Sequence, residues 1–158
     1  MKSVLLTGIL GLAMVGTAIE ARADCQQVRG TDVETVIPSN DALGRVLGVV
    51  DGVLNGASTS YLTSASDDFL NSTSNDVFVT RAGDILMATG VVVLTPIAGS
   101  TDLLEAATLT VTGGSGKYDR ATGTIKLAGR ASFDDNGGTF DVTYRGSVCG
   151  PNIERGRR

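Results

Sequence analysis

The chain has 158 residues, of which 42% are hydrophobic, with 13 Lys and Arg against 17 Asp and Glu and no histidine. A net charge of −4 argues against a nucleic-acid partner, because phosphate binding needs a basic surface. The lack of histidine removes the commonest general base and the commonest transition-metal ligand, so the composition excludes a histidine-based catalytic or metal site.

The first 23 residues have the pattern of a secretory signal peptide. Lys2 supplies a positive charge, an apolar run extends from Val4 to Ile19, and Ala21-Arg-Ala23 places small residues where a signal peptidase cleaves. The run is shorter than the roughly 20 residues that span a bilayer, and Asp24 stands where a lipoprotein signal needs a small residue. We therefore predict cleavage before Asp24 and a secreted or periplasmic protein without membrane attachment. A retained membrane anchor is the alternative.

The mature part, residues 24–158, is long enough for one domain with its own core. It carries 11 basic and 16 acidic residues, a net charge of −5. We place the domain at 24–150 and a basic tail at 151–158, whose three arginines we expect to be solvated.

Two cysteines, Cys25 and Cys149, stand near the two ends of this domain. An even pair in an exported chain predicts a disulfide, and two free thiols are the alternative. A bridge that closes so long a loop would stabilise the fold by about 4–5 kcal/mol in the chain-entropy model.

Short runs that alternate with turn signals make up the rest of the domain. The mature part is rich in β-branched residues, the chain has 21 glycines and 3 prolines, and no window keeps a helical period. The pattern predicts eight strands, at about 28–37, 43–54, 57–65, 75–81, 84–94, 103–112, 123–133 and 138–148. The polar stretch 64–75 is predicted as a loop. This spacing is typical of an all-β sandwich or barrel.

The later strands differ in how many of their faces are apolar. In the seventh, Ile125 and Leu127 alternate with Thr124 and Lys126, which predicts one buried and one solvated face. The fifth, at 84–94, is apolar on both faces and needs cover beyond the core, so we expect a loop over it or self-association into a homo-oligomer.

The cysteine positions favour a barrel over a sandwich. In an up-and-down barrel of eight strands, the first and last strands are antiparallel neighbours. Cys25 precedes the first strand and Cys149 follows the last, so one bridge would join the closing seam. We therefore predict an all-β fold, a closed eight-stranded antiparallel up-and-down β-barrel.

Residues 110–118 read TVTGGSGKY and residues 121–124 read ATGT. This pair of segments resembles the signature of the allene oxide cyclase-like and dirigent-like barrels, in which a short helical turn joins two late strands. The resemblance implies an eight-stranded barrel with a largely apolar interior, often oligomeric, that works without a metal or organic cofactor. It assigns a structural role to the motif residues, which are Gly113, Gly114, Gly116, Lys117, Tyr118 and Gly123.

Members of these families confine a reactive intermediate and use a carboxylate inside the barrel. The resemblance points to Glu34, the only glutamate on the first predicted strand, as the counterpart of the cyclase glutamate. The residues around Glu34 do not reproduce the family pattern. Asp51, on the second predicted strand, is the candidate for a dirigent-type carboxylate.

Two other segments resemble binding motifs but lack the residues or the spacing that those motifs require. Residues 113–117 suggest a phosphate-binding loop, but Val111 stands where that loop needs glycine and Tyr118 where it needs Ser or Thr. Residues 134–138 group three oxygen-bearing side chains but lack the spacing and distal glutamate of a calcium loop, so we expect a hairpin turn.

The sequence and the family resemblance leave three functions open. The first is an exported barrel that binds a small hydrophobic molecule inside. The alternatives are a cofactor-free cyclase, isomerase or dirigent-like enzyme, and a structural or interaction protein with a side-chain-filled barrel. A filled barrel would lack a cavity, a binder would have an open apolar cavity, and an enzyme would place a carboxylate of raised pKa in it.

Overall fold

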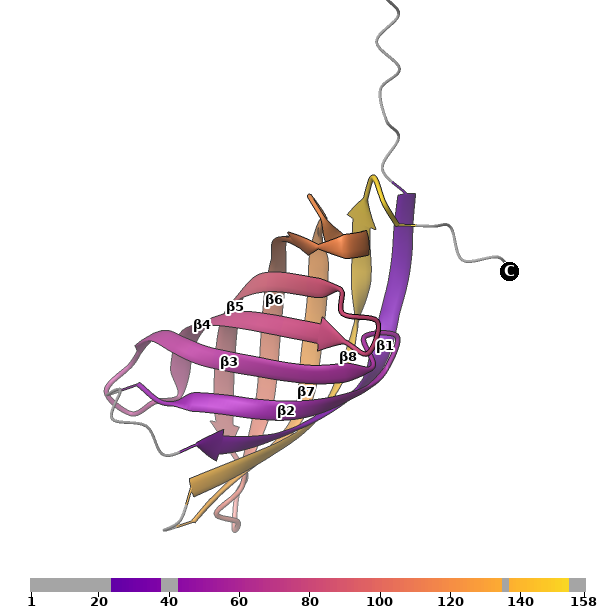
Figure 1. The fold of residues 1–158 in the computed structure, drawn as a ribbon. Coiled ribbons are helices and arrows are strands. Elements are labelled where there is room, and N and C mark those ends of the chain that lie inside the picture. Colours follow the sequence, from indigo (N-terminus) through magenta and orange to yellow (C-terminus); the bar gives the residue numbers. More distant parts are fainter. Residues whose placement is uncertain (1–23, 38–42, 135–136, 154–158) are drawn as a thin grey trace, which may run out of the picture.

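The computed structural model describes residues 24–37, 43–134 and 137–153. The predicted signal peptide at 1–23 and residues 154–158 lie outside the described residues. Eight strands form one closed sheet in which each pairs antiparallel with the next and β8 pairs with β1 (Figure 1). The elements are β1 (Asp24–Ile37), β2 (Arg45–Gly52), β3 (Gly56–Ala65), β4 (Asn71–Thr80), β5 (Ile85–Pro96), β6 (Leu103–Ser115), the 3-10 turn η1 (Gly116–Tyr118), β7 (Thr122–Asp134) and β8 (Gly137–Gly150).

The predicted closed eight-stranded antiparallel up-and-down β-barrel is confirmed. Successive side chains of a strand point to opposite faces of the sheet, so an alternating sequence fills the inside and solvates the outside. In β7, Ile125 and Leu127 are buried, whereas Thr124 and Lys126 are exposed, as the alternation predicts.

The largest differences in strand limits are at β1, which begins at Asp24 and not near residue 28, and at β4, which begins at Asn71 and not near residue 75. The stretch 64–75 was predicted as a loop because it is polar. In the structure Ser74 is only 2% exposed and faces the interior of the barrel. The expectation of a largely apolar interior is therefore wrong at this level of the barrel. Polar residues extend β4 because the positions that they occupy face other polar side chains.

One end of the barrel is closed by packed side chains. The turn η1 lies there, near the start of β1 and the end of β8 (Figure 1), and its Tyr118 is buried in the core together with Leu54 and Ile153. The Tyr144 hydroxyl accepts a hydrogen bond from the Leu54 amide at 2.9 Å and donates one to the Asp51 carbonyl at 2.9 Å. Ile153 belongs to this core although the sequence placed it in the tail.

The predicted disulfide is confirmed at the same end. Cys25 and Cys149 are register partners on β1 and β8 and are bonded to each other, with 3.9 Å between their Cα atoms. The bridge therefore links the first and last strands where the sheet closes.

The glycine-rich motif builds η1 and anchors it to the β4–β5 turn. Gly116 has a φ of +63°, and a Cβ there would lie 2.1 Å from Asp84 Oδ1. The Lys117 amide donates to the same oxygen at 3.1 Å, and its ammonium lies 4.8 Å from the centre of the Tyr118 ring. The remaining motif residues lie on the flanking strands and are Gly113, Gly114 and Gly123.

The outer face of β5 is apolar, as the sequence predicted. Met87, Val91 and Val93 are exposed, while Leu86 and Ala88 on the inner face are buried. Self-association through this face stays a prediction. The described part of the chain contains no helix with the length and hydropathy needed to cross a bilayer.

Candidate functional site

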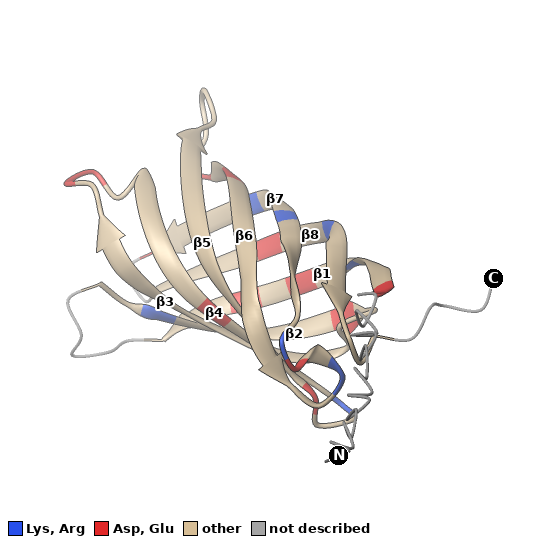
Figure 2. Ribbon diagram, turned by 90° about the horizontal axis from the view of Figure 1, so that it is seen from above, with Lys and Arg blue, Asp and Glu red and all other residues tan. Residues whose placement is uncertain are grey.

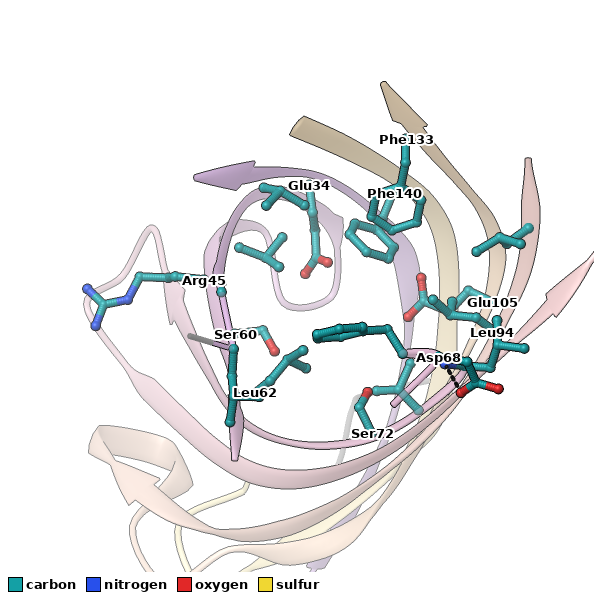
Figure 3. A pocket seen from close by; sticks show the side chains of 18 residues that line it. Glu34, Arg45, Ser60, Leu62, Asp68, Ser72, Leu94, Glu105, Phe133 and Phe140 are labelled. Carbon is teal, nitrogen blue, oxygen red and sulfur yellow. Dashed lines mark hydrogen bonds between the residues drawn. The ribbon is translucent and has the colours of Figure 1, made fainter. Parts of the chain in front are cut away.

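The end of the barrel opposite η1 holds a cavity of about 390 Å³ (Figure 3). It lies between the far ends of β1, β3, β5 and β7 and the starts of the strands that follow them. Its volume falls in the range of small-molecule pockets, roughly 300–1,000 Å³. The apolar side chains that line it are Val36, Leu43, Val46, Leu62, Phe69, Leu70, Val92, Leu94, Leu103, Phe133 and Phe140.

Aromatic rings stand at the rim of this cavity. Phe133 and Phe140 pack edge to face with their ring centres 5.6 Å apart. Phe69 has a φ of +58°, a conformation that bulky residues rarely adopt, and its side chain lines the cavity while 52% exposed. The loop holds this geometry because the Phe69 amide donates to the Ser66 carbonyl at 2.9 Å and the Leu70 amide to Asp68 Oδ1 at 3.1 Å.

Four acidic side chains lie inside the barrel and form what we call the interior acidic cluster: Asp32 and Glu34 from β1, Asp76 from β4 and Glu105 from β6. Figure 2 shows acidic positions in red on these strands. Glu34 and Glu105 line the cavity. Asp32 and Asp76 lie closer to the closed end and are 0% and 8% exposed.

Asp32 and Glu34 share one serine hydroxyl. Ser58 Oγ lies 3.0 Å from Asp32 Oδ1 and 3.4 Å from Glu34 Oε1. Gly48 is the register partner of both Glu34 and Ser58. A Cβ at this position would lie 2.2 Å from Ser58 Oγ and 2.4 Å from Asp32 Oδ1. The missing side chain of Gly48 therefore makes room for the carboxyl groups.

Asp76 has similar surroundings on the adjacent strands β3 and β4. Ser60 donates to Asp76 Oδ1 at 2.6 Å, and Ser74 donates to Oδ2 at 2.8 Å. Gly90 is the register partner of Ser74, and a Cβ there would lie 2.2 Å from Ser74 Oγ and 2.9 Å from Asp76 Oδ2. Gly48 and Gly90 thus leave space for two sets of hydrogen-bonded serine and carboxylate side chains.

The pKa values of the two carboxyl groups of β1 are raised by different amounts. Burial, followed by the negative charges of Asp32 and Glu105, raises the pKa of Glu34 to about 9. Burial raises the pKa of Asp32 only to about 6, because hydrogen bonds from Ser58 and from the protonated Glu34 favour its ionised form. At neutral pH the pair therefore holds about one proton, and the order of the two pKa values favours Glu34 as its site.

The other two members are also shifted upward. Burial, with the charges of Asp32 and Asp76, raises the pKa of Glu105 to about 7. Burial raises the pKa of Asp76 as well, against the opposing effect of its two serine donors. Near neutral pH the cluster is thus partly ionised and holds negative charge in a buried site.

Among the described residues, no basic side chain points into the cavity to balance this charge. Arg45 is the only basic residue that lines the cavity in the described structure, and Figure 3 shows its guanidinium directed away from it. Both ion pairs found among the described residues involve other carboxylates. Asp32 Oδ2 and Glu105 Oε2 are buried without a hydrogen-bond donor there, apart from the proton that Glu34 can offer Asp32.

Metal binding by this cluster is not supported by its geometry. In the described ranges no three side chains of His, Cys, Asp or Glu are arranged to hold a metal ion. The turn at 134–138, considered above for calcium, includes residues 135–136, which lie outside the described residues.

The two carboxylates singled out from the sequence lie in different places. Glu34 lines the cavity, whereas Asp51 is exposed at the end of β2 and does not line it. Val50 is buried, so alternation turns Asp51 outward. Sequence reasoning missed Asp32, Asp76 and Glu105. The available signal was a set of polar residues two apart on several strands, which marks one polar face.

Comparisons with known proteins add little to this site. No family model matches the chain, and no curated protein matches its sequence. A solved structure described as the pterocarpan synthase dirigent protein is similar over 86% of this chain and 90% of that protein, with 10% identity and a TM-score of 0.36. Similarity at this level carries no conclusion about ligand or activity. The likeness to allene oxide cyclases stays a prediction.

Proposed function

We propose that the protein binds a small, mostly apolar molecule in the cavity at the open end of the barrel. The observation that carries this proposal is a cavity of about 390 Å³ whose walls are apolar and whose base holds the carboxyl groups of Glu34 and Glu105. Apolar walls supply affinity, and a few convergent polar groups fix the orientation of a ligand. A barrel filled by side chains would leave no such space.

Two neighbouring valines of β5 allow a matched test. Val92 lines the cavity, while Val93 is 40% exposed on the outer face. Val92→Trp should fill part of the cavity and weaken binding of the uncharged fluorescent dye N-phenyl-1-naphthylamine by roughly tenfold or more. Val93→Trp should leave the dye affinity unchanged. Fluorescence titration measures both. Absence of dye binding to the wild type, or equal loss in both variants, would contradict the proposal.

A second candidate function is favoured by the proton on Glu34. Glu34 lines the cavity and its pKa is raised to about 9, so its carboxyl group can act as a general acid. Asp32, which is buried and does not line the cavity, can exchange a proton only through Glu34. This pair fits a cofactor-free isomerisation or cyclisation of an enclosed molecule. A binder without turnover would not need the pair.

Turnover can be sought without knowing the substrate. A small-molecule extract incubated with the wild-type protein should yield a product of unchanged mass and altered chromatographic retention. Glu34→Gln removes the acidic proton and should abolish that product, while dye binding persists. Asp141→Asn, an exposed carboxylate on β8, should retain it. Mass spectrometry reads the result, and a product formed equally by Glu34→Gln would exclude Glu34 as the acid.

The proposed place of action is outside the reducing cytoplasm, either secreted or periplasmic. The bonded Cys25–Cys149 pair supports this location, because disulfides persist in oxidising compartments. The signal-peptide pattern of the first 23 residues supports it independently.

A further inference from the structure

We propose that the ligand of this cavity carries a protonated amine, which binds against the carboxyl groups of Glu105 and Glu34 that line the cavity. This inference rests on the proposed binding function and names its chemical class: an apolar body with one organic ammonium group. Apolar contacts with the walls would hold the body, and the interior acidic cluster would hold the nitrogen.

Glu105 is the centre of the argument. Its side chain lines the cavity, the residue is only 7% exposed, and Oε2 has no hydrogen-bond donor among the described residues. A buried carboxylate oxygen without a donor is costly, since water that would otherwise solvate it is excluded. Figure 3 shows Glu105 projecting into the cavity from the side opposite Ser60, where a bound molecule can reach it.

The charge balance of the cavity favours a cation. The acidic cluster brings four carboxyl groups together, and Arg45, the one basic residue among the described residues of the cavity wall, points away. An ammonium group would supply both the missing positive charge and up to three N–H donors. Hydrogen bonds between charged partners are roughly twice as strong as neutral ones, and more so where water is excluded.

Other ligand classes fit less well. A ligand with a carboxylate would add negative charge to an acidic site. A metal ion lacks a suitable group of ligands within the described structure. A neutral alcohol could receive a hydrogen bond from Glu34 but would leave the charge on the cluster unbalanced. Among these classes, only an ammonium group supplies both a hydrogen-bond donor for the unpartnered oxygen of Glu105 and a positive charge that balances the cluster.

Three probes with the same alkyl chain separate these classes. Octylamine, 1-octanol and octanoate would each compete with N-phenyl-1-naphthylamine at about pH 8, where an alkylamine is still protonated. We expect octylamine to displace the dye at a concentration roughly tenfold or more below that of 1-octanol, with octanoate the weakest. Glu105→Gln should reduce the preference for the amine to about threefold or less and leave 1-octanol unchanged. Asp141→Asn should retain the full preference.

The pH gives an independent readout. Lowering the pH from about 8 to about 5 adds protons to the cluster, so the preference for octylamine over 1-octanol should shrink in the wild type and shrink less in Glu105→Gln, which lacks the titrating carboxyl that lines the cavity. The charged and titratable groups that face Glu105 or stand at the rim are Asp32, Glu34, Asp76, Asp68 and Arg45.

The outcomes distinguish this inference from the binding function beneath it. If 1-octanol and the dye bind, and Val92→Trp weakens them, while octylamine binds no better, the cavity is a ligand site and the amine inference is wrong. An amine preference that survives Glu105→Gln also overturns it. If neither the dye nor any alkyl probe binds, both the inference and the binding function fail.

Discussion

The free energy of unfolding is expected to fall as the pH rises from about 4 to about 9. The carboxyl groups of Asp32, Glu34 and Glu105 have pKa values raised to about 6, 9 and 7 in the folded protein. The folded state therefore binds these protons more tightly than the unfolded chain. Their stabilisation is complete below the unfolded values and is lost as the pH passes through the folded values. Glu105 alone corresponds to a loss on the order of 3 kcal/mol.

Urea denaturation at several pH values measures this dependence. Glu105→Gln cannot ionise, so its stability should decline less between about pH 5 and pH 9, with the difference on the order of 3 kcal/mol. Asp141→Asn, which alters an exposed carboxylate, should follow the wild type. A stability that is constant or increases toward pH 9 would mean that the cluster ionises freely and is not buried.

Reduction of the Cys25–Cys149 bridge should lower the free energy of unfolding by about 4–5 kcal/mol, the value for a closed loop of this length. The loss arises mainly because the reduced unfolded chain gains conformational freedom. It corresponds to a fall in melting temperature of roughly 10–20 °C for a domain of this size. Thermal unfolding followed by circular dichroism, with and without reductant, measures the change.

A double variant supplies the control for this result. Cys25→Ser with Cys149→Ser should match the reduced wild type, and reductant should have no effect on it. An unchanged melting temperature on reduction would show that the ends of β1 and β8 are held by their strand pairing and the packing around Tyr118 alone. Retained dye binding in the reduced protein would be expected, since the cavity lies at the opposite end of the barrel.

The two predictions concern the two ends of the barrel, which differ in structure. The closed end carries the bridge, η1 and the buried Tyr118, Leu54 and Ile153. The open end has the cavity and the acidic cluster, where burial of carboxyl groups costs stability. Polar groups retained at such a cost, with two glycines leaving room for them, are a common mark of a functional site.

The sequence alone was sufficient for the architecture. Alternation with period two predicted the strands, and cysteines at both ends of the domain favoured closure of the first strand on the last. The polar start of β4 escaped prediction, because strand rules assume that inward positions are apolar. Asp51 was considered for the interior because the resemblance implies a carboxylate within the barrel and Asp51 lies on the second predicted strand, but alternation turns it outward.

Only the tertiary structure decided which polar residues meet. Alternation shows that Asp76 and Glu105 each lie on the same face of their strand as the residues two positions away. It does not show at what height along the barrel axis each residue lies. That height depends on the stagger between paired strands, which arises from closure of the whole sheet. Asp32, Asp76 and Glu105 come from three strands far apart in sequence, and their pKa values depend on the burial and charges that this stagger creates.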